Sequence, residues 1–75
     1  MRADKVLREI IDKENLSATE VSLRVGKTRK YMSTLFSHHR IPQADTMAGI
    51  CDAIGYDLLV RSRDDGYEIL IDPPE

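Results

Sequence analysis

The amino-acid sequence predicts a small, mainly α fold of four short helices over about residues 3–56, followed by a β-hairpin over about residues 57–72. Up to Gly55, apolar side chains recur at spacings of three and four, the period of amphipathic helices. Beyond Gly55, strand-forming residues flank the turn signal Asp64-Asp65-Gly66. The length of 75 residues leaves room for a single domain.

Apolar stripes predict the first and fourth helices. The first is expected over residues 3–14, with one stripe made by Val6, Leu7, Ile10 and Ile11. The fourth is expected to follow Pro42, a residue suited to the first turn of a helix, and to end at Gly55. Its stripe consists of Met47, Ile50, Cys51 and Ile54.

Capping signals predict the second helix. Ser17 and Glu20 have the spacing of a capping box, in which Ser17 caps the helix and Glu20 reaches back to it. Val21 and Val25 then point inward. Gly26 ends the helix because glycine readily adopts a left-handed conformation.

The third helix is expected to run from Arg29 to about His38, with Thr28 as its N-cap. Its apolar stripe, expected in the core, consists of Met32, Leu35 and Phe36. The rest of its surface carries Arg29, Lys30, Ser33 and Thr34.

Two strands are predicted at residues 57–63 and 67–71. A lone hairpin is marginally stable in water, so its apolar residues require cover from the helices or from a second subunit. Arg61 and Arg63 are expected to protect an edge or to form salt bridges in a dimer.

Charge is distributed unevenly along the chain. The whole chain has a formal net charge of −2, yet residues 21–44 contain no acidic side chain. That segment carries Arg24, Lys27, Arg29, Lys30 and Arg40. The asymmetry indicates one positive face on an otherwise acidic domain. The alternative is an ordinary solvated surface.

Composition excludes several classes of protein. The single cysteine, Cys51, permits no internal disulfide and is expected to be buried. His38 and His39 lack a third ligand, so neither a metal nor another cofactor is expected. No apolar run approaches the ~18 residues of a membrane span, and residues 1–5 lack a signal-peptide core, so we expect a cytoplasmic protein. No catalytic residues are predicted, because no nucleophile has a base partner.

The segment from Ala18 to Phe36 carries the functional signal. It predicts two short helices joined by a tight turn at Gly26, with the small residue Ser22 where the helices would cross closely. A helix fits the major groove of DNA, and the N-terminal residues of a recognition helix then lie nearest the base edges. This arrangement is typical of a helix-turn-helix.

Over roughly residues 16–56 the chain resembles the lambda-repressor-like (Cro/cI, XRE-type) helix-turn-helix regulators. The residues that carry the resemblance are Leu16, Ser17, Glu20, Val21, Ser22, Val25, Gly26, Thr28, Arg29, Met32, Ser33, Leu35, Pro42, Thr46, Ile54 and Gly55. The chain departs from the family at Ala18, where phage repressors often have glutamine, and at Lys27, which is usually apolar. The hairpin resembles the added strand of some antitoxin-type members, whose strands form a sheet shared by two subunits.

The resemblance implies DNA contacts for nine positions. Base edges would be contacted by Arg29, Lys30, Ser33 and Thr34. Phosphates would be contacted by Ser17, Lys27, Thr28, Tyr31 and Arg40. For Tyr31, packing against the helix surface is the alternative. Phosphate contacts would make binding salt-dependent without setting its sequence preference.

These observations predict a DNA-binding transcriptional regulator from a prokaryote or phage. It would act as a homodimeric repressor that reads a palindrome in double-stranded DNA through the helix starting at Thr28. Two alternatives stay open. The hairpin and the acidic residues after Tyr56 favour an antitoxin that also binds a toxin, and the net acidity together with Ala18 allows a domain that binds only protein.

Overall fold

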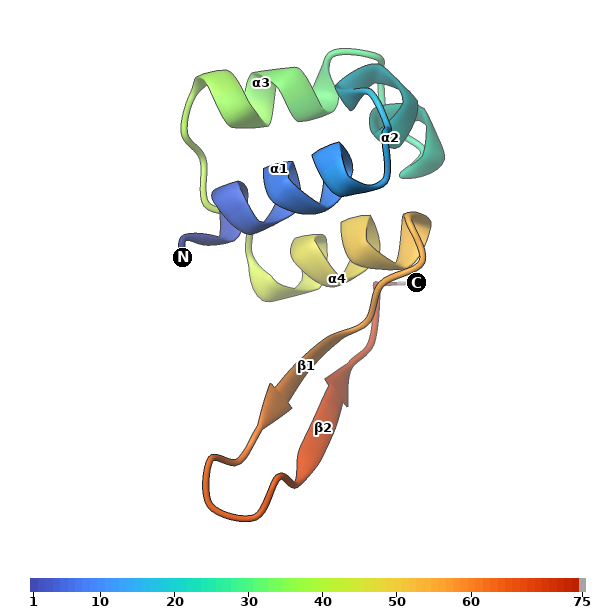
Figure 1. Ribbon diagram of the computed structural model, residues 1–75. Coiled ribbons are helices and arrows are strands. Elements are labelled where there is room, and N and C mark those ends of the chain that lie inside the picture. The colour runs from blue at the N-terminus through green and yellow to red at the C-terminus, as the bar shows by residue number, and fades with distance from the viewer. Residues whose placement is uncertain (75) are drawn as a thin grey trace. The chain divides into compact units, whose positions relative to one another are not determined.

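A computed structural model describes residues 1–74 of the chain, which divides into two compact units. The three-helix unit, residues 1–42, contains α1 (Ala3–Lys13), α2 (Ala18–Arg24) and α3 (Tyr31–Ser37). The hairpin unit begins at Gln43 and contains α4 (Ala44–Ala53), β1 (Leu58–Arg61) and β2 (Glu68–Ile71) (Figure 1). The mainly helical class with a two-stranded hairpin is thereby confirmed.

The α1 helix follows the predicted stripe. Leu7 and Ile11 are buried, and the helix ends at Lys13 because Asn15 adopts a left-handed φ of 55°. The Leu16 N–H then donates to the Ile11 carbonyl at 3.0 Å, which closes the helix end. The helix thus ends one residue before the predicted end at residue 14.

The N-cap of α2 is confirmed, whereas its capping box is only half formed. The Ser17 hydroxyl accepts from the Glu20 backbone N–H at 3.0 Å. The Glu20 carboxylate accepts from Arg24 Nη2 at 3.0 Å instead of reaching back to Ser17. An i,i+4 ion pair, which neighbours on one helix face readily form, has replaced the predicted return bond.

The turn after α2 also agrees with the sequence. Gly26 has a φ of 84°, a left-handed conformation that a side chain would strain. The Lys27 N–H donates to the Ser22 carbonyl at 3.0 Å across this glycine, as in a Schellman-type helix end. The chain therefore reverses tightly between α2 and α3.

The predicted start of the third helix was wrong. Residues 28–31 form a turn in which the Tyr31 N–H donates to the Thr28 carbonyl at 3.1 Å. Lys30, with φ −92° and ψ 2°, occupies the third position of this turn and is the N-cap of α3, with no side-chain capping bond. Thr28 is therefore not the N-cap, and the helix begins at Tyr31 and ends at Ser37 rather than running from Arg29 to His38.

In the hairpin unit, α4 buries most of its predicted stripe. Ile50, Cys51 and Ile54 are buried, together with Ala48, while Met47 is half-buried. The helix begins at Ala44 after Gln43 as N-cap, so Pro42 lies just before it rather than in its first turn. Beyond the end of α4, Gly55 has a φ of 82°.

The strands are paired as predicted but are shorter. In antiparallel register the pairs are Leu58 with Ile71, Leu59 with Leu70, Val60 with Ile69, and Arg61 with Glu68. The Ser62 N–H donates to the Tyr67 carbonyl at 2.8 Å, and the chain turns through Gly66 with φ 77°. None of the helices in residues 1–74 is long and apolar enough to cross a membrane.

Candidate nucleic-acid interface

A buried hydroxyl fixes α3 against α2. Ser22 is fully buried, and its Oγ donates to the Ala18 carbonyl at 2.7 Å. The same oxygen accepts from the Met32 backbone N–H at 2.9 Å. Met32 is the second residue of α3, where a capping side chain ordinarily accepts a bond. Ser22 thus supplies from α2 the cap that Thr28 was expected to supply locally.

The buried side of α3 determines which residues face solvent. Met32 and Leu35 are buried, whereas Ser33, Thr34 and Ser37 are exposed. Together with the exposed Lys30 they have the spacing of one helical face: Lys30, Ser33, Thr34 and Ser37. We call these four residues the α3 stripe. Three of them are predicted base contacts, and all three lie on this solvent face.

Ser37 is the member of the α3 stripe that sequence reasoning missed. The sequence contained the signal for it, because Ser37 stands three positions after Thr34 and four positions after Ser33. The Ser37 hydroxyl donates to the Thr34 carbonyl at 3.4 Å, and the Ser33 hydroxyl donates to the Lys30 carbonyl at 3.3 Å. Both hydroxyls stay at the surface, because these bonds to backbone carbonyls are long. Each hydroxyl can therefore donate to a ligand instead of to its carbonyl.

Cationic side chains gather before the first turn of α3. Arg29 and Lys30 are exposed in the turn formed by residues 28–31. Lys27 Nζ lies 5.9 Å from the centroid of the half-buried Tyr31 ring. The structure therefore brings together Lys27 and Tyr31, two of the predicted phosphate contacts, next to two predicted base contacts.

Of the remaining phosphate candidates, Thr28 belongs to the same turn, whereas Ser17 and Arg40 lie on other segments. Ser17 is exposed at the start of α2, where its hydroxyl caps the helix. Arg40 is exposed beyond the other end of α3, and its N–H donates to the Leu35 carbonyl at 3.0 Å. Seven helical residues span roughly 10 Å, so Arg40 does not join the cations at the start of α3. Thr28 is exposed, and its carbonyl is used by the turn.

Arg8 was not among the predicted contacts, yet the structure places it beside the α3 stripe. Its guanidinium carbon lies 5.0 Å from the centroid of the Phe36 ring. Phe36, which was expected in the core, is only half-buried. A shallow pocket is lined by Arg8, Ala18, Ser33, Phe36 and Ser37. No sequence signal could have found this contact between α1 and α3, because the two residues are far apart in the chain.

Cys51, on α4, is buried, as predicted. Burial raises the pKa of its thiol above the ordinary value of 9.0. The thiol is therefore protonated at neutral pH and is a poor nucleophile.

The geometry of the site is thus a cation-bearing turn, an exposed hydroxyl-rich stripe and a flanking arginine. Within residues 21–42 no acidic side chain opposes these groups. Such a surface can donate hydrogen bonds and attract an anionic partner. Comparison of the chain with protein-family models, curated proteins and solved structures gives no match.

Proposed function

We propose that this protein is a sequence-specific DNA-binding transcriptional regulator of the lambda-repressor-like helix-turn-helix type, and that it acts as a homodimeric repressor. The observation that carries the proposal is the α3 stripe, exposed on a short helix whose second N–H is held by Ser22 of α2. Two crossed helices with one buried against the other and one outward polar face suit insertion into the major groove.

The residues have distinct roles in this proposal. Arg29 and Lys30, ahead of the first turn, reach guanine edges, which is the commonest specific contact made by basic side chains. The hydroxyls of Ser33, Thr34 and Ser37 contact base edges further along the groove. Lys27 and Tyr31 contact phosphate on one side, and Ser17, Thr28 and Arg40 make further phosphate contacts.

Electrostatics support an anionic partner despite the net charge of −2. The five cations of residues 21–44 face no acid from their own segment. The neighbouring acid Glu20 pairs with one of them, Arg24, which leaves Lys27, Arg29, Lys30 and Arg40 as the cations of this segment that can attract a ligand. Local potential, rather than net charge, steers a charged ligand to a surface.

Selection on random duplex DNA tests the proposal. The wild-type protein should enrich a palindrome with half-sites about 10 base pairs apart. Binding should weaken with a log–log salt slope of roughly −5 to −8 for six to nine neutralised phosphates. Folded protein that enriches no motif, or binding that ignores salt, would overturn the proposal.

A matched pair of variants separates recognition from general charge. Arg29→Ala/Lys30→Ala should lower affinity for the enriched site by roughly a hundredfold or more, at about 1–3 kcal/mol for each base contact. Lys13→Glu lowers the charge by the same two units at an exposed position at the end of α1, away from the residues of the interface, and should change affinity little. Equal losses in both variants would argue for unspecific attraction.

A second candidate function is that of an antitoxin, or of a domain that binds only protein. The exposed apolar side chains of the hairpin favour it, among them Val60, Ile69 and Leu70. A toxin complex should be recovered from the source organism at native levels, and its formation should be indifferent to Arg29→Ala/Lys30→Ala. Absence of a stable partner there would leave DNA binding as the function.

A further inference from the structure

The hairpin packs against α4, yet it exposes several large apolar side chains. Val60 and Ile69, which face each other across the strands, are 59% and 56% exposed. Leu59 and Leu70, the neighbouring pair, are 40% and 51% exposed. In the described residues the sheet has only these two strands, so each strand has an unpaired outer edge. Isolated hairpins are marginal, whereas three or more strands can be stable.

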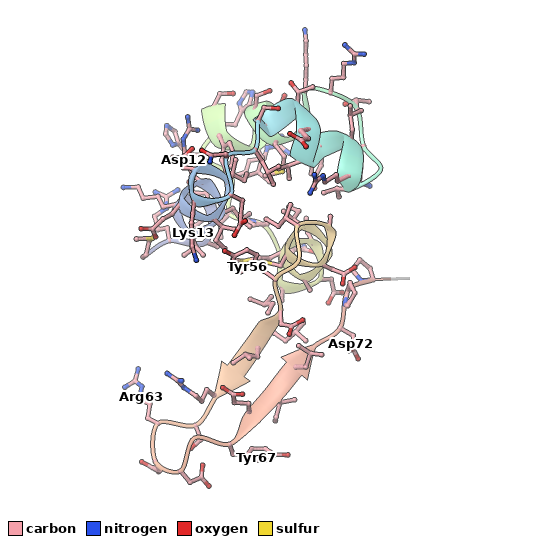
Figure 2. All side chains as sticks on the ribbon, turned by 45° about the vertical axis from the view of Figure 1, so that its right-hand side comes forward. Asp12, Lys13, Tyr56, Arg63, Tyr67 and Asp72 are labelled. Atoms are coloured by element: carbon pink, nitrogen blue, oxygen red, sulfur yellow. The ribbon has the colours of Figure 1, made fainter. Side chains whose placement is uncertain are left out.

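The two outer edges differ in charge. The β1 strand and its flanks carry both signs, with Asp57 before the strand and Arg61 at its end. The β2 strand and its flanks carry only acids, Glu68 and Asp72. Figure 2 shows Asp72 near the base of the hairpin, and Tyr67 and Arg63 at its turn.

Twofold pairing distinguishes these edges. When two copies of β1 pair antiparallel about Leu59, Asp57 of each copy lies opposite Arg61 of the other, and Leu58 lies opposite Val60. Opposite charges in such positions stabilise a sheet, and like charges destabilise it. Two copies of β2 paired about Leu70 would instead place Glu68 opposite Asp72 twice.

We propose that two copies of this chain associate through their β1 edges, antiparallel about Leu59. The result is a four-stranded sheet in the order β2-β1-β1-β2, with an Asp57–Arg61 pair on each side of the twofold axis. The inference rests on the homodimer of the proposed function and names the surface that forms it. The sheet retains in-chain pairing, including Arg61 opposite Glu68, and leaves the acidic β2 edges outermost, where charge discourages further strand addition.

Cysteine cross-linking tests the register directly. In a Cys51→Ala background, Leu59→Cys places two thiols opposite each other on the axis, at a spacing that a disulfide can bridge. We expect a covalent dimer under mild oxidation. Leu70→Cys is the matched control, because it lies on β2, about 14 Å from its counterpart across three strand spacings, and should not cross-link. Cross-linking through Leu70→Cys alone, or through neither cysteine, would overturn the proposal.

Charge reversal tests the pairing in the uncross-linked protein. Asp57→Arg should weaken the dimer roughly tenfold or more in sedimentation equilibrium, because each introduced guanidinium would face Arg61 of the other copy. It should not weaken the hairpin itself, since residue 57 lies one step beyond the Leu58–Ile71 pair, beside Asp72. Asp57→Arg/Arg61→Asp/Glu68→Arg restores both the in-chain and the inter-chain pairs and should restore the dimer. Asp72→Arg, on the outer edge, should leave dimerisation unchanged.

The outcomes separate this inference from the proposed function. A protein that is monomeric yet still enriches a single half-site would overturn β1 pairing and leave DNA recognition standing. A dimer that cross-links through Leu59→Cys but enriches no DNA would support β1 pairing and overturn DNA recognition. A dimer unaffected by Asp57→Arg would overturn the charge argument.

Discussion

The three-helix unit and the hairpin unit use their apolar residues in opposite ways. In the first, Leu7, Val21 and Met32 are fully buried, and a buried hydroxyl at Ser22 ties two helices together. In the second, α4 has a buried stripe, but the strands leave large aliphatic side chains more than half exposed at Val60 and Ile69. The three-helix unit buries its large apolar side chains within itself, whereas the hairpin unit presents apolar surface that a second molecule can cover.

Truncation of one apolar side chain in each unit should show the largest contrast. Met32→Ala should destabilise the monomer by about 2–5 kcal/mol, because it leaves a cavity at a fully buried position. Ile69→Ala, at an exposed position, should change monomer stability by less than about 1 kcal/mol. Urea unfolding at low protein concentration measures both. A larger loss of stability in Ile69→Ala than in Met32→Ala would contradict this difference between the units.

Ser22→Ala should have the next largest effect. The substitution removes the acceptor of the Met32 N–H and leaves that group buried and unpaired, which costs about 1–3 kcal/mol. Ser33→Ala, which removes an exposed hydroxyl from the same unit, is the control and should stay within about 0.5 kcal/mol. Thermal unfolding compares them. Equal stabilities would mean that the Ser22 hydroxyl does not fix α3.

Arg8→Ala should affect binding more clearly than stability. Loss of an exposed cation over the Phe36 ring costs about 0.5–1 kcal/mol of folding free energy. If Arg8 neutralises a phosphate, its removal lowers DNA affinity uniformly across sequences and makes the log–log salt slope shallower by about 1. Arg8→Lys should recover the slope. If Arg8→Ala leaves the log–log salt slope of DNA binding unchanged, Arg8 does not contact a phosphate.

The smallest predicted effect concerns the turn of the hairpin. The pKa of Asp65 is lowered, first by the backbone N–H of Tyr67, which donates to Oδ1 at 3.0 Å, and then by Ser62. A carboxylate with a depressed folded pKa stabilises the fold above its unfolded pKa, and this contribution disappears as pH falls through the folded value. The Tm difference between wild type and Asp65→Asn should therefore narrow in acid. A difference that is constant with pH would exclude ionisation as its cause.

The sequence correctly predicted the ends of those elements that depend on residues close together in the chain. Ser17 caps α2, Gly26 ends it, and the turn at Gly66 joins two paired strands, all as predicted. Each of these depends on residues within a few positions of one another. The exposed side of α3 was also predictable, because burial of Met32 and Leu35 follows from their spacing.

The start of α3 could not be predicted in the same way. Thr28 has the residue type of an N-cap, but the bond that serves the helix comes from Ser22 on another helix. The position of Arg8 over Phe36 likewise depends on how α1 and α3 pack. The spacing of residues in the sequence predicts the faces of a single helix. It does not predict which side chains of two different helices come into contact.

The shortness of α3 has a consequence for how its surface can be transferred. A helix of seven residues does not persist as a free peptide. Its first turn depends on the Ser22 hydroxyl, and beyond its last turn the His39 carbonyl accepts from Arg2 Nη2 at 3.1 Å. The α3 surface is therefore not a portable peptide motif. Any graft that aims to move this surface to another scaffold must carry the supporting parts of α1 and α2 as well.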